Sequence, residues 1–469
     1  MTAAQGTLSP TVPAHRHPRF RRARVDSVVR SATGSALWLS LLLMTYWWVA
    51  DRGLQDLGGW ASGLTSAGRL TGLVAADLLL VQVLLMARLP LLERAFGQDR
   101  LARQHRIVGF TSFNLMLAHI VLITWGYAGG GLGATPSTLW NLTTTYPGML
   151  LAAAGTVCLV LVVVTSVKIA RARLRYESWH LLHLYAYLGV GLALPHQLWT
   201  GQQFLASRAS TVFWWGAWGA TAAAVLVWRV LLPLWRSARH LLRVTSVVHE
   251  APGIVSVYVT GRGLHRLPVE AGQFLTWRFL GRHGWTRANP YSLSAAPDGR
   301  SLRITVKESG DGSAEAAYLR PGTRVLVEGP YGRLSPRARQ RHRVALIGSG
   351  VGVTPLRALA EGLEYAPGDA VLVQRYRDHP LFEHELTALE NERGLQTLYL
   401  PGRRRARDSW LGSGVGTADD LTALTWWIPD IAERDVYVCG PPEWTESVRL
   451  TCEAAGLPPE HFHVETFGW

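Results

Sequence analysis

The fold of the first half of the chain is indicated most clearly by QHRIVGFTSFNLMLAH, residues 104–119. This apolar stretch has His105 near its start and His119 at its end. A second apolar stretch, HLYAYLGVGLALPH at residues 183–196, also has a histidine at each end. Because an α-helix rises about 1.5 Å per residue, the histidines of each stretch lie roughly 20 Å apart along a helix. Ionisable residues are rare and usually functional in such stretches, so the pattern predicts two stacked haems held by histidines.

The helical phase of the two pairs differs. His105 and His119 are fourteen positions apart and return to within about 40° of one helix face. His183 and His196 are thirteen positions apart, so on an ideal helix their side chains would point about 140° away from each other. Their helix therefore needs the distortion that Pro195 can supply. Taken singly, each histidine is better interpreted as a helix-terminal or satisfied core residue; the four histidines at matching depths on two helices together favour metal ligation.

Six apolar segments are long enough to cross a bilayer, which takes about 20 residues each. They lie at 34–52, 66–88, 106–127, 148–168, 179–200 and 211–233. The Arg-rich start of the first resembles a signal peptide, but no small-residue cleavage site stands out and five more segments follow, so we interpret it as a span.

Basic residues predict the orientation of these spans. They gather before the first span and in the second and fourth connections, whereas the other connections contain almost no basic residues. The positive-inside rule then predicts a multi-pass protein of the plasma membrane with both termini cytoplasmic. His105 and His183 fall near the cytoplasmic face, with His180 as a competitor of His183, and His119 and His196 lie nearer the exterior.

Other polar residues occur in the second span. Arg69 either extends to the interface or neutralises a haem propionate. Asp77 and Gln82 are expected to form hydrogen bonds between helices.

Bulk properties fit a protein with a membrane half and a soluble half. The 469 residues carry a net charge of +14, but the basic residues are spread over the N-terminal tail, alternate connections and soluble patches, which argues against nucleic-acid binding. Three scattered cysteines exclude a disulfide framework and a zinc site.

The second half begins with short β-branched alternations from about Leu241, which predict an antiparallel β-barrel. After Pro336 strands and helices alternate, as in a Rossmann-like α/β nucleotide-binding sheet. The predicted domains are a basic, disordered tail at 1–33, a six-helix transmembrane haem-binding domain at 34–235, the barrel at 236–336 and the α/β domain at 337–469.

A glycine-rich loop, GSGVGVTP at residues 348–355, follows a predicted strand and opens a helix. Glycines let the backbone approach a pyrophosphate, and the helix N-terminus supplies oriented amides. Thr354 is the expected N-cap, Pro355 suits the first turn, and Val353 stands where a strict GxGxxG motif has its last glycine. The candidate phosphate-binding residues are Gly348, Gly350, Gly352, Val353, Thr354 and Pro355.

The end of the next predicted strand carries Arg375 and Arg377, and a second basic run follows at 403–405. Arginines at this place suit the 2′-phosphate of NADPH, whereas an acidic residue favours NADH. Asp378 therefore keeps NADH possible.

With these motifs in place, residues 34–469 resemble the ferric reductase / NADPH oxidase family of membrane flavocytochromes b. The histidine spacings of fourteen and thirteen resemble the haem-ligand pattern of that family. The resemblance implies that His105 and His183 bind an inner haem b and that His119 and His196 bind an outer haem b.

The soluble half resembles ferredoxin–NADP reductases, which implies an FAD-binding barrel. The segment 289–292, NPYS, falls where the family has Arg-x-Tyr-Ser or His-Pro-Phe-Ser. By that resemblance Tyr291 packs on the isoalloxazine and Ser292 hydrogen-bonds near flavin N5, while Asn289 replaces the basic or histidine residue. The segment 310–313, GDGS, matches the motif whose amides cradle the FAD pyrophosphate.

The segment 439–442, CGPP, matches the nicotinamide-side motif of the family, and the sequence ends in ETFGW. The family places a C-terminal aromatic residue over the flavin, which implies Trp469 or else Phe467. The candidate catalytic residues are Tyr291, Ser292, Cys439, Glu465 and Trp469. The remaining cofactor-binding candidates are Asn289, Pro290, Val306, Lys307, Gly312, Ser313, Gly440 and Pro441.

The resemblance implies an NADPH-dependent enzyme that passes electrons through FAD and two haems b to an external acceptor, either ferric iron or O₂. Its expected partners are membrane lipid, NADPH and that acceptor. One alternative is a membrane-anchored NAD(P)H flavoprotein reductase that serves a cytoplasmic acceptor. Another is a haem-binding membrane protein without enzymatic activity.

Overall fold

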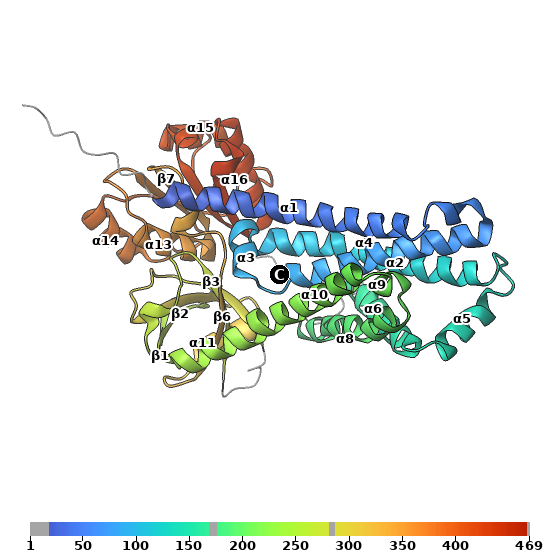
Figure 1. Ribbon diagram of the computed structural model, residues 1–469. Helices are drawn as coiled ribbons and strands as arrows, with labels where there is room; N and C mark the ends of the chain where they lie inside the picture. The colour runs from blue at the N-terminus through green and yellow to red at the C-terminus, as the bar shows by residue number, and fades with distance from the viewer. Residues whose placement is uncertain (1–17, 168–175, 281–286, 467–469) are drawn as a thin grey trace, which may run out of the picture. The chain divides into compact units, whose positions relative to one another are not determined.

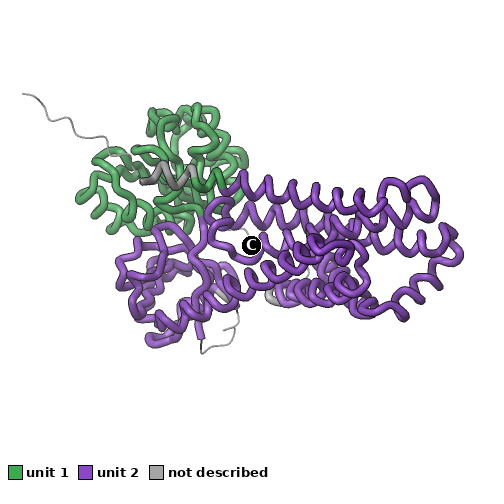
Figure 2. Tube along the Cα trace, viewed as in Figure 1, with its two compact units in different colours: residues 1–28, 333–469 green, residues 29–332 purple. Residues whose placement is uncertain are grey.

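The computed structural model describes residues 18–167, 176–280 and 287–466. The chain divides into two compact units (Figure 2). Unit 1 comprises residues 1–28 and 333–469, and unit 2 comprises residues 29–332.

Long helices form most of the first half of the chain (Figure 1). They are α1 (Pro18–Ala50), α2 (Trp60–Leu85), α4 (Gln98–Tyr127), α6 (Met149–Ser166), α8 (Tyr176–Thr200) and α10 (Arg208–Ala224), which continues through a π-helix (Val225–Leu231) into α11 (Leu232–His240). The shorter helices are η1 (Gln55–Gly58), α3 (Pro90–Phe96), α5 (Thr135–Thr145) and α9 (Gln202–Leu205).

Five of these helical segments are long and apolar enough to cross a membrane. They are Val25–Ala50, Trp60–Leu85, Gln98–Tyr127, Met149–Ser166 and Arg208–His240. The fifth predicted span forms α8, but this helix is not among the five, so the six-span count is not confirmed. Its histidines, tyrosines and Gln197 lower the hydropathy of α8.

Small residues allow the helices of unit 2 to approach closely. A Cβ on Gly155 of α6 would lie 2.7 Å from the carbonyl oxygen of Gly189 on α8. A Cβ on Gly68 of α2 would lie 2.9 Å from the side chain of Ile123 on α4. Glycines at such contacts bring helix backbones together, as is common in membrane bundles. The result is a tight α2–α4 pair and a tight α6–α8 pair.

The rest of unit 2 contains two antiparallel sheets of three strands each, in the orders β1-β2-β5 and β4-β3-β6. The strands are β1 (Arg243–Ala251), β2 (Ile254–Thr260), β3 (Phe274–Phe279), β4 (Asn289–Ser292), β5 (Ser301–Lys307) and β6 (Val325–Tyr331). Isolated bridges join Arg243 to Arg324 and Leu293 to Ile304. The antiparallel strands are as predicted, but the two sheets do not close into one, so the barrel is not confirmed.

Unit 1 contains a five-stranded sheet in the order β11-β10-β7-β8-β9, with every neighbouring pair parallel. The strands are β7 (Val344–Ser349), β8 (Ala370–Arg375), β9 (Gln396–Leu400), β10 (Asp435–Gly440) and β11 (Phe462–Thr466). The larger helices are α13 (Val353–Gly362), α14 (Glu383–Arg393), α15 (Asp420–Trp427) and α16 (Pro442–Ala454). Apolar, fully buried central strands are typical of parallel sheets covered on both faces, and the predicted α/β alternation is confirmed.

Candidate functional site

The four histidines lie in two facing pairs formed by α4 and α8. The ring centroids of His105 and His183 are 6.0 Å apart, and those of His119 and His196 are 6.3 Å apart. Two imidazole nitrogens that share one metal at about 2 Å each hold their rings roughly 6 Å apart. Each pair therefore has the separation that one shared metal requires.

Helix α2 fixes the two rings on α4. His105 Nδ1 donates to the carbonyl oxygen of Gln82 at 2.9 Å, and His119 Nδ1 donates to that of Gly68 at 2.8 Å. A hydrogen bond of this kind selects the tautomer whose Nε2 lone pair can bind a metal. The sequence analysis did not find these carbonyl partners, because they depend on how α2 packs against α4.

The rings on α8 also use Nδ1. His196 Nδ1 lies 3.3 Å from the carbonyl oxygen of Ala193, and His183 Nδ1 lies 3.3 Å from Ser166 Oγ. Pro195 is accommodated inside α8, which runs from Tyr176 to Thr200.

Glycines keep space around the pair formed by His119 and His196. A Cβ on Gly72 would lie 2.5 Å from His119 Nδ1, and one on Gly148 would lie 2.8 Å from the backbone nitrogen of His196. Among the described residues no group of three or more His, Cys, Asp or Glu side chains is arranged for a metal ion. The donor sets are thus pairs of imidazoles, which fit the two axial positions of a haem iron.

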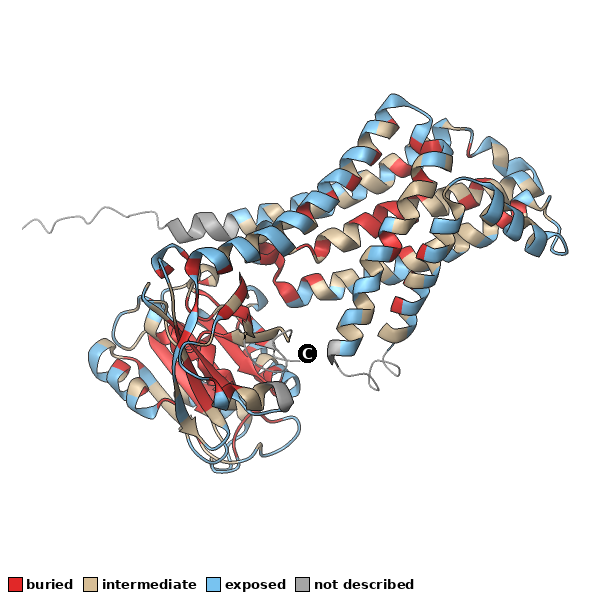
Figure 3. Cartoon of the chain, turned by 90° about the horizontal axis from the view of Figure 1, so that it is seen from below, coloured by how far each residue is buried: buried red, intermediate tan, exposed pale blue. Residues whose placement is uncertain are grey.

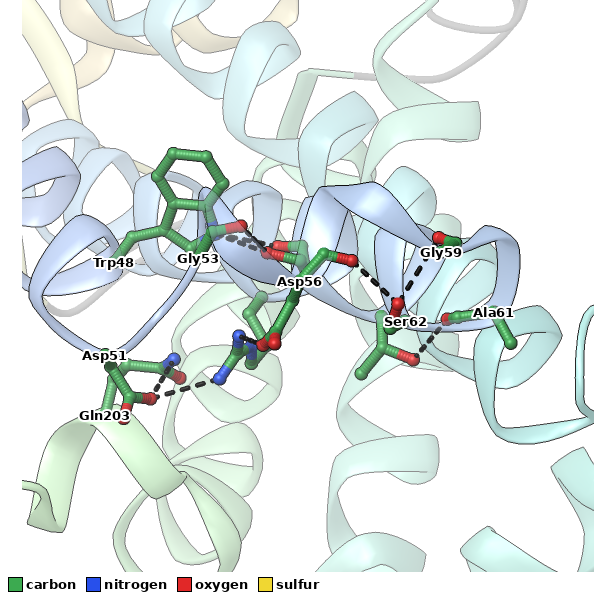
Figure 4. A network of polar contacts seen from close by, with 11 residues as sticks. Trp48, Asp51, Gly53, Asp56, Gly59, Ala61, Ser62 and Gln203 are labelled. Atoms are coloured by element: carbon green, nitrogen blue, oxygen red, sulfur yellow. Dashed lines mark hydrogen bonds and ion pairs between the residues drawn. The ribbon is translucent and has the colours of Figure 1, made fainter.

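Arg69 on α2 belongs to a polar network with Asp51 and with Asp56 of η1. Figure 4 labels Asp51, Asp56 and Gln203 of this network. The Arg69 guanidinium forms ion pairs with Asp51 at 3.1 Å and Asp56 at 2.6 Å, and Gln203 donates to the same oxygen of Asp51 at 3.0 Å. The partners of this arginine are therefore two carboxylates that follow the end of α1. Asp77 accepts a hydrogen bond from Ser40 on α1 at 2.8 Å, which confirms its predicted interhelical bond.

The first flavin-motif segment forms β4, which pairs with β3. Ser292 is buried, and its hydroxyl has no hydrogen-bond partner among the described residues. Buried hydroxyls are nearly always paired, so this one fits a group that a bound flavin would supply. Burial raises the pKa of the neighbouring Tyr291 to about 12, so its phenol is neutral at physiological pH.

The second flavin motif begins a short helix, α12 (Asp311–Ala314). Ser313 Oγ accepts from the backbone nitrogen of Ser309 at 2.8 Å and donates to the carbonyl oxygen of Gly310 at 2.9 Å. At the end of β5, Val306 is buried and Lys307 is exposed.

The glycine-rich loop joins β7 to α13 through a 3-10 turn, η6 (Gly350–Gly352). The helix starts at Val353 without a side-chain cap, and the hydroxyl of Thr354 donates to the carbonyl oxygen of Val351 instead. The predicted N-cap role of Thr354 is therefore wrong, because the 3-10 turn moves the start of the helix two residues earlier, with Gly352 as the N-cap. Pro355 lies in the first turn, as predicted.

Two candidate motifs meet at the middle of the parallel sheet. Cys439 of β10 pairs with Gly348 of β7 on one side and with Glu465 of β11 on the other. A Cβ on Gly352 would lie 2.3 Å from the carbonyl oxygen of Cys439, so only glycine allows this approach. Strand order changes direction between β7 and β10, and ligands of open α/β sheets bind at such a switch point.

Burial, followed by the charge of Glu465, raises the pKa of Cys439 well above its ordinary value, so the thiol is not a thiolate at neutral pH. Trp469 and Phe467, the two candidates for the flavin-stacking residue, lie outside the described residues.

The basic residues after β8 differ in their surroundings. Arg375 Nη1 donates to Ser349 Oγ at 3.1 Å, which ties the end of β8 to the glycine-rich loop. Arg377 is exposed. In the second basic run, Arg404 donates to Ser447 Oγ at 2.7 Å and Arg405 donates to the carbonyl oxygen of Ala418 at 2.9 Å.

Comparisons with known proteins cover both halves of the chain. Residues 71–194 match the family described as ferric reductase like transmembrane component. The ferredoxin reductase component of 3-ketosteroid-9-alpha-monooxygenase from Mycolicibacterium smegmatis is 32% identical over 239 residues, which are 48% of this chain and 65% of that protein. A flavohemoprotein from Xylella fastidiosa is 29% identical over 214 residues, 43% of this chain and 52% of that protein.

A solved structure of the flavohem-like FAD/NAD binding domain of nitric oxide dioxygenase from Vibrio cholerae is 24% identical, with a TM-score of 0.39; the match covers 49% of this chain and all of that domain. The chain spans about half to two thirds of the length of the curated relatives it matches. Residues 71–194 are therefore similar to a ferric reductase-like transmembrane component, and about the second half of the chain is similar to ferredoxin reductase components of monooxygenases.

Proposed function

We propose that this protein is a plasma-membrane oxidoreductase that passes electrons from cytoplasmic NADPH, through FAD and two b-type haems, to ferric iron or O₂ on the external side. The observation that carries the proposal is the presence of two facing histidine pairs on the same two helices. Their ring separations of 6.0 and 6.3 Å, together with the Nδ1 hydrogen bonds to α2, support haem ligation at two depths.

Four residues would hold the haems, with His105 and His183 on one and His119 and His196 on the other. Haem ligated by two histidines supplies one-electron transfer without an open coordination position. The role of α2 is to hold the two α4 rings at fixed angles, because the carbonyl oxygens of Gln82 and Gly68 accept their Nδ1 protons. No side chain needs to act as a nucleophile or general base.

In the soluble half, FAD would supply hydride acceptance and one-electron release. The unpaired hydroxyl of Ser292 would donate a hydrogen bond to the flavin ring. The loop from Gly348 to Gly352 would approach the nucleotide pyrophosphate, because its glycines carry no side chains that would keep the phosphates away. Cys439 would lie beside the nicotinamide, with its buried thiol in the neutral form.

Arg375 supports NADPH as the donor. Its contact with Ser349 holds a cation beside the phosphate-binding loop, where it can pair with a 2′-phosphate.

Several curated relatives are reductase components of monooxygenases, which favours a second candidate function. In that case the helices anchor the flavoprotein, and electrons go to a cytoplasmic protein acceptor.

The experiment is a steady-state and absorbance assay of the purified, cofactor-loaded protein in lipid nanodiscs. NADPH is added with chelated Fe(III) or with O₂, each with and without superoxide dismutase. We expect reduced flavin, then reduced low-spin haem bands, then acceptor turnover. Sensitivity of iron reduction to the dismutase identifies O₂ as the direct acceptor, and insensitivity identifies iron. Flavin reduction in a protein without haem would instead establish the anchored reductase.

A further inference from the structure

A buried arginine follows α2 within unit 2. The backbone of Arg88 has a φ of +65°, in the left-handed region, and its side chain is only 14% exposed. Its Nη1 donates to a carboxylate oxygen of Glu93 on α3 at 3.2 Å. An arginine in left-handed backbone and largely out of solvent costs free energy, so its position is maintained by specific partners.

Two of those partners belong to the last strand of the flavin-motif sheet. The guanidinium carbon of Arg88 lies 4.2 Å from the ring centroid of Tyr331, and its Nε lies 3.7 Å from a carboxylate oxygen of Glu328. The Tyr331 hydroxyl donates to the same carboxylate at 2.9 Å. Arg88 is thus held by a cation–π contact and by two carboxylates, one from the helical part and one from β6.

The end of the last long helix contacts the same strand. Ser237 Oγ of α11 accepts from the backbone nitrogen of Val327 at 3.2 Å, and Arg236 donates to the carbonyl oxygen of Gly329. Figure 1 shows α11 running beside β6. Strand β6 is therefore fixed to the helical part at two points, and the one around Arg88 contains an ion pair.

This cluster lies between the two candidate redox sites. On the helical side, Arg88 is six positions from Gln82, whose carbonyl oxygen holds the His105 ring. On the sheet side, Phe274 of β3 is the register partner of both Tyr331 and Ser292. A short chain of backbone and side-chain contacts thus joins His105 of the cytoplasmic-side pair to Ser292, whose hydroxyl is expected to contact the flavin.

We propose that Arg88 is a positioning residue that fixes the flavin-motif sheet against the cytoplasmic end of α2 and so sets the distance over which electrons leave the flavin. This inference rests on the proposed function. Rates of electron transfer fall steeply with distance, and small misplacements of reacting groups cost up to about 100-fold. A buried pair of this kind contributes geometric definition more than net stability.

The test uses Arg88→Met, which keeps an unbranched aliphatic stem and removes the guanidinium and its charge, and Arg88→Lys, which keeps the charge but not the planar group. Arg94→Met is the matched control, because Arg94 is an exposed arginine on α3. Stopped-flow absorbance follows flavin reduction and haem reduction separately in the cofactor-loaded protein. Hydrogen exchange at residues 86–97 and 325–331 is measured without NADPH.

For Arg88→Met we expect unchanged flavin reduction, haem reduction slowed at least about tenfold, and faster exchange in both segments. Arg88→Lys should fall between this variant and the wild type, and Arg94→Met should match the wild type. Wild-type exchange and wild-type haem reduction in Arg88→Met would overturn the proposal.

If Arg88→Met does not fold, Glu328→Gln replaces it, with the same changes expected and the same result overturning the proposal. A wild-type protein whose haem NADPH cannot reduce would refute the proposed function, whereas the exchange measurement would still decide whether Arg88 fixes β6.

Discussion

The membrane-spanning helices and the parallel sheet of unit 1 bury their apolar residues in opposite ways. Trp38 on α1 and Phe110 on α4 are 69% and 65% exposed, whereas Val344 and Ile347 of β7 are fully buried. Figure 3 shows exposed residues along the long helices and a continuous buried block in the strands. Lipid covers the helices and protein covers the sheet, so the same apolar composition serves two different surroundings.

The two regions also build their candidate sites differently. In the helices the site consists of four side chains: the rings of His105, His119 and His196 lie beside carbonyl oxygens, and that of His183 lies beside the Ser166 hydroxyl. In the sheet it consists mainly of loop backbone, which approaches Cys439 because Gly352 has no side chain. Side-chain removal should therefore damage the first site most, and side-chain addition should damage the second.

The largest effect should come from His119→Ala. We expect loss of one of two haems and a fall of at least about 100-fold in reduction of the external acceptor, because the metal loses an axial ligand. Flavin reduction by NADPH should be unchanged. Haem content is measured by pyridine haemochrome and the reactions by stopped-flow absorbance. His180→Gln is the control and should keep both haems; full haem content in His119→Ala would show that this residue is not a ligand.

Adding a side chain at the sheet site should have the reverse effect of His119→Ala, with slower flavin reduction and unchanged haem content. Gly352→Val requires the loop to move, since a Cβ would lie 2.3 Å from the Cys439 carbonyl oxygen, and overpacking costs about 1–3 kcal/mol or more. We expect flavin reduction by NADPH to slow by about tenfold or more, with haem content unchanged. The control is Gly416→Val, because a Cβ on Gly416 meets nothing within 4 Å. Equal rates in the two variants would contradict the close approach.

A smaller effect is expected from Arg375→Ala, which tests side-chain recognition within the sheet site. A charge-assisted bond to a 2′-phosphate is worth about 1.5–3 kcal/mol, so the KM for NADPH should rise about tenfold or more. The KM for NADH should stay near the wild-type value. Arg343→Ala, at the other end of β7, is the control. A parallel rise for both nucleotides would assign Arg375 a structural role through Ser349.

The smallest effect concerns Asp435, which is fully buried in β10 and accepts hydrogen bonds from the rings of His461 at 2.9 Å and His463 at 3.1 Å. Burial raises the pKa of Asp435, but the hydrogen bond and charge of His463, with the Arg341 amide, outweigh it and hold the pKa below its ordinary value. The ionised form therefore stabilises the fold above about pH 4, and this contribution is lost as the pH falls further.

Asp435→Asn should lower the free energy of unfolding by about 1–3 kcal/mol at pH 7. The difference from the wild type should shrink as the pH falls below about 4. Chemical unfolding followed by tryptophan fluorescence measures both, with Asp378→Asn as an exposed control. If the difference in free energy of unfolding between Asp435→Asn and the wild type does not change with pH, the ionised carboxylate is excluded as its cause.

Sequence periodicity predicted most strands of the three sheets and most long helices, because these depend on local pattern, but it did not predict the short strands β4 and β11. It did not predict that the antiparallel strands form two sheets, since closure depends on contacts between distant strands. The histidine positions were readable, whereas the carbonyl partners of His105 and His119 and the space left by Gly72 depend on the packing of α2 against α4. Arg88 was seen only as a basic loop residue, because its partners on β6 are more than 200 positions away.

The central claim is that one chain holds two haems in series between α4 and α8. The most direct measurement is a pyridine haemochrome assay on pure, cofactor-replete protein, expressed per chain. The account predicts two iron porphyrins per chain, and a value near zero would contradict it.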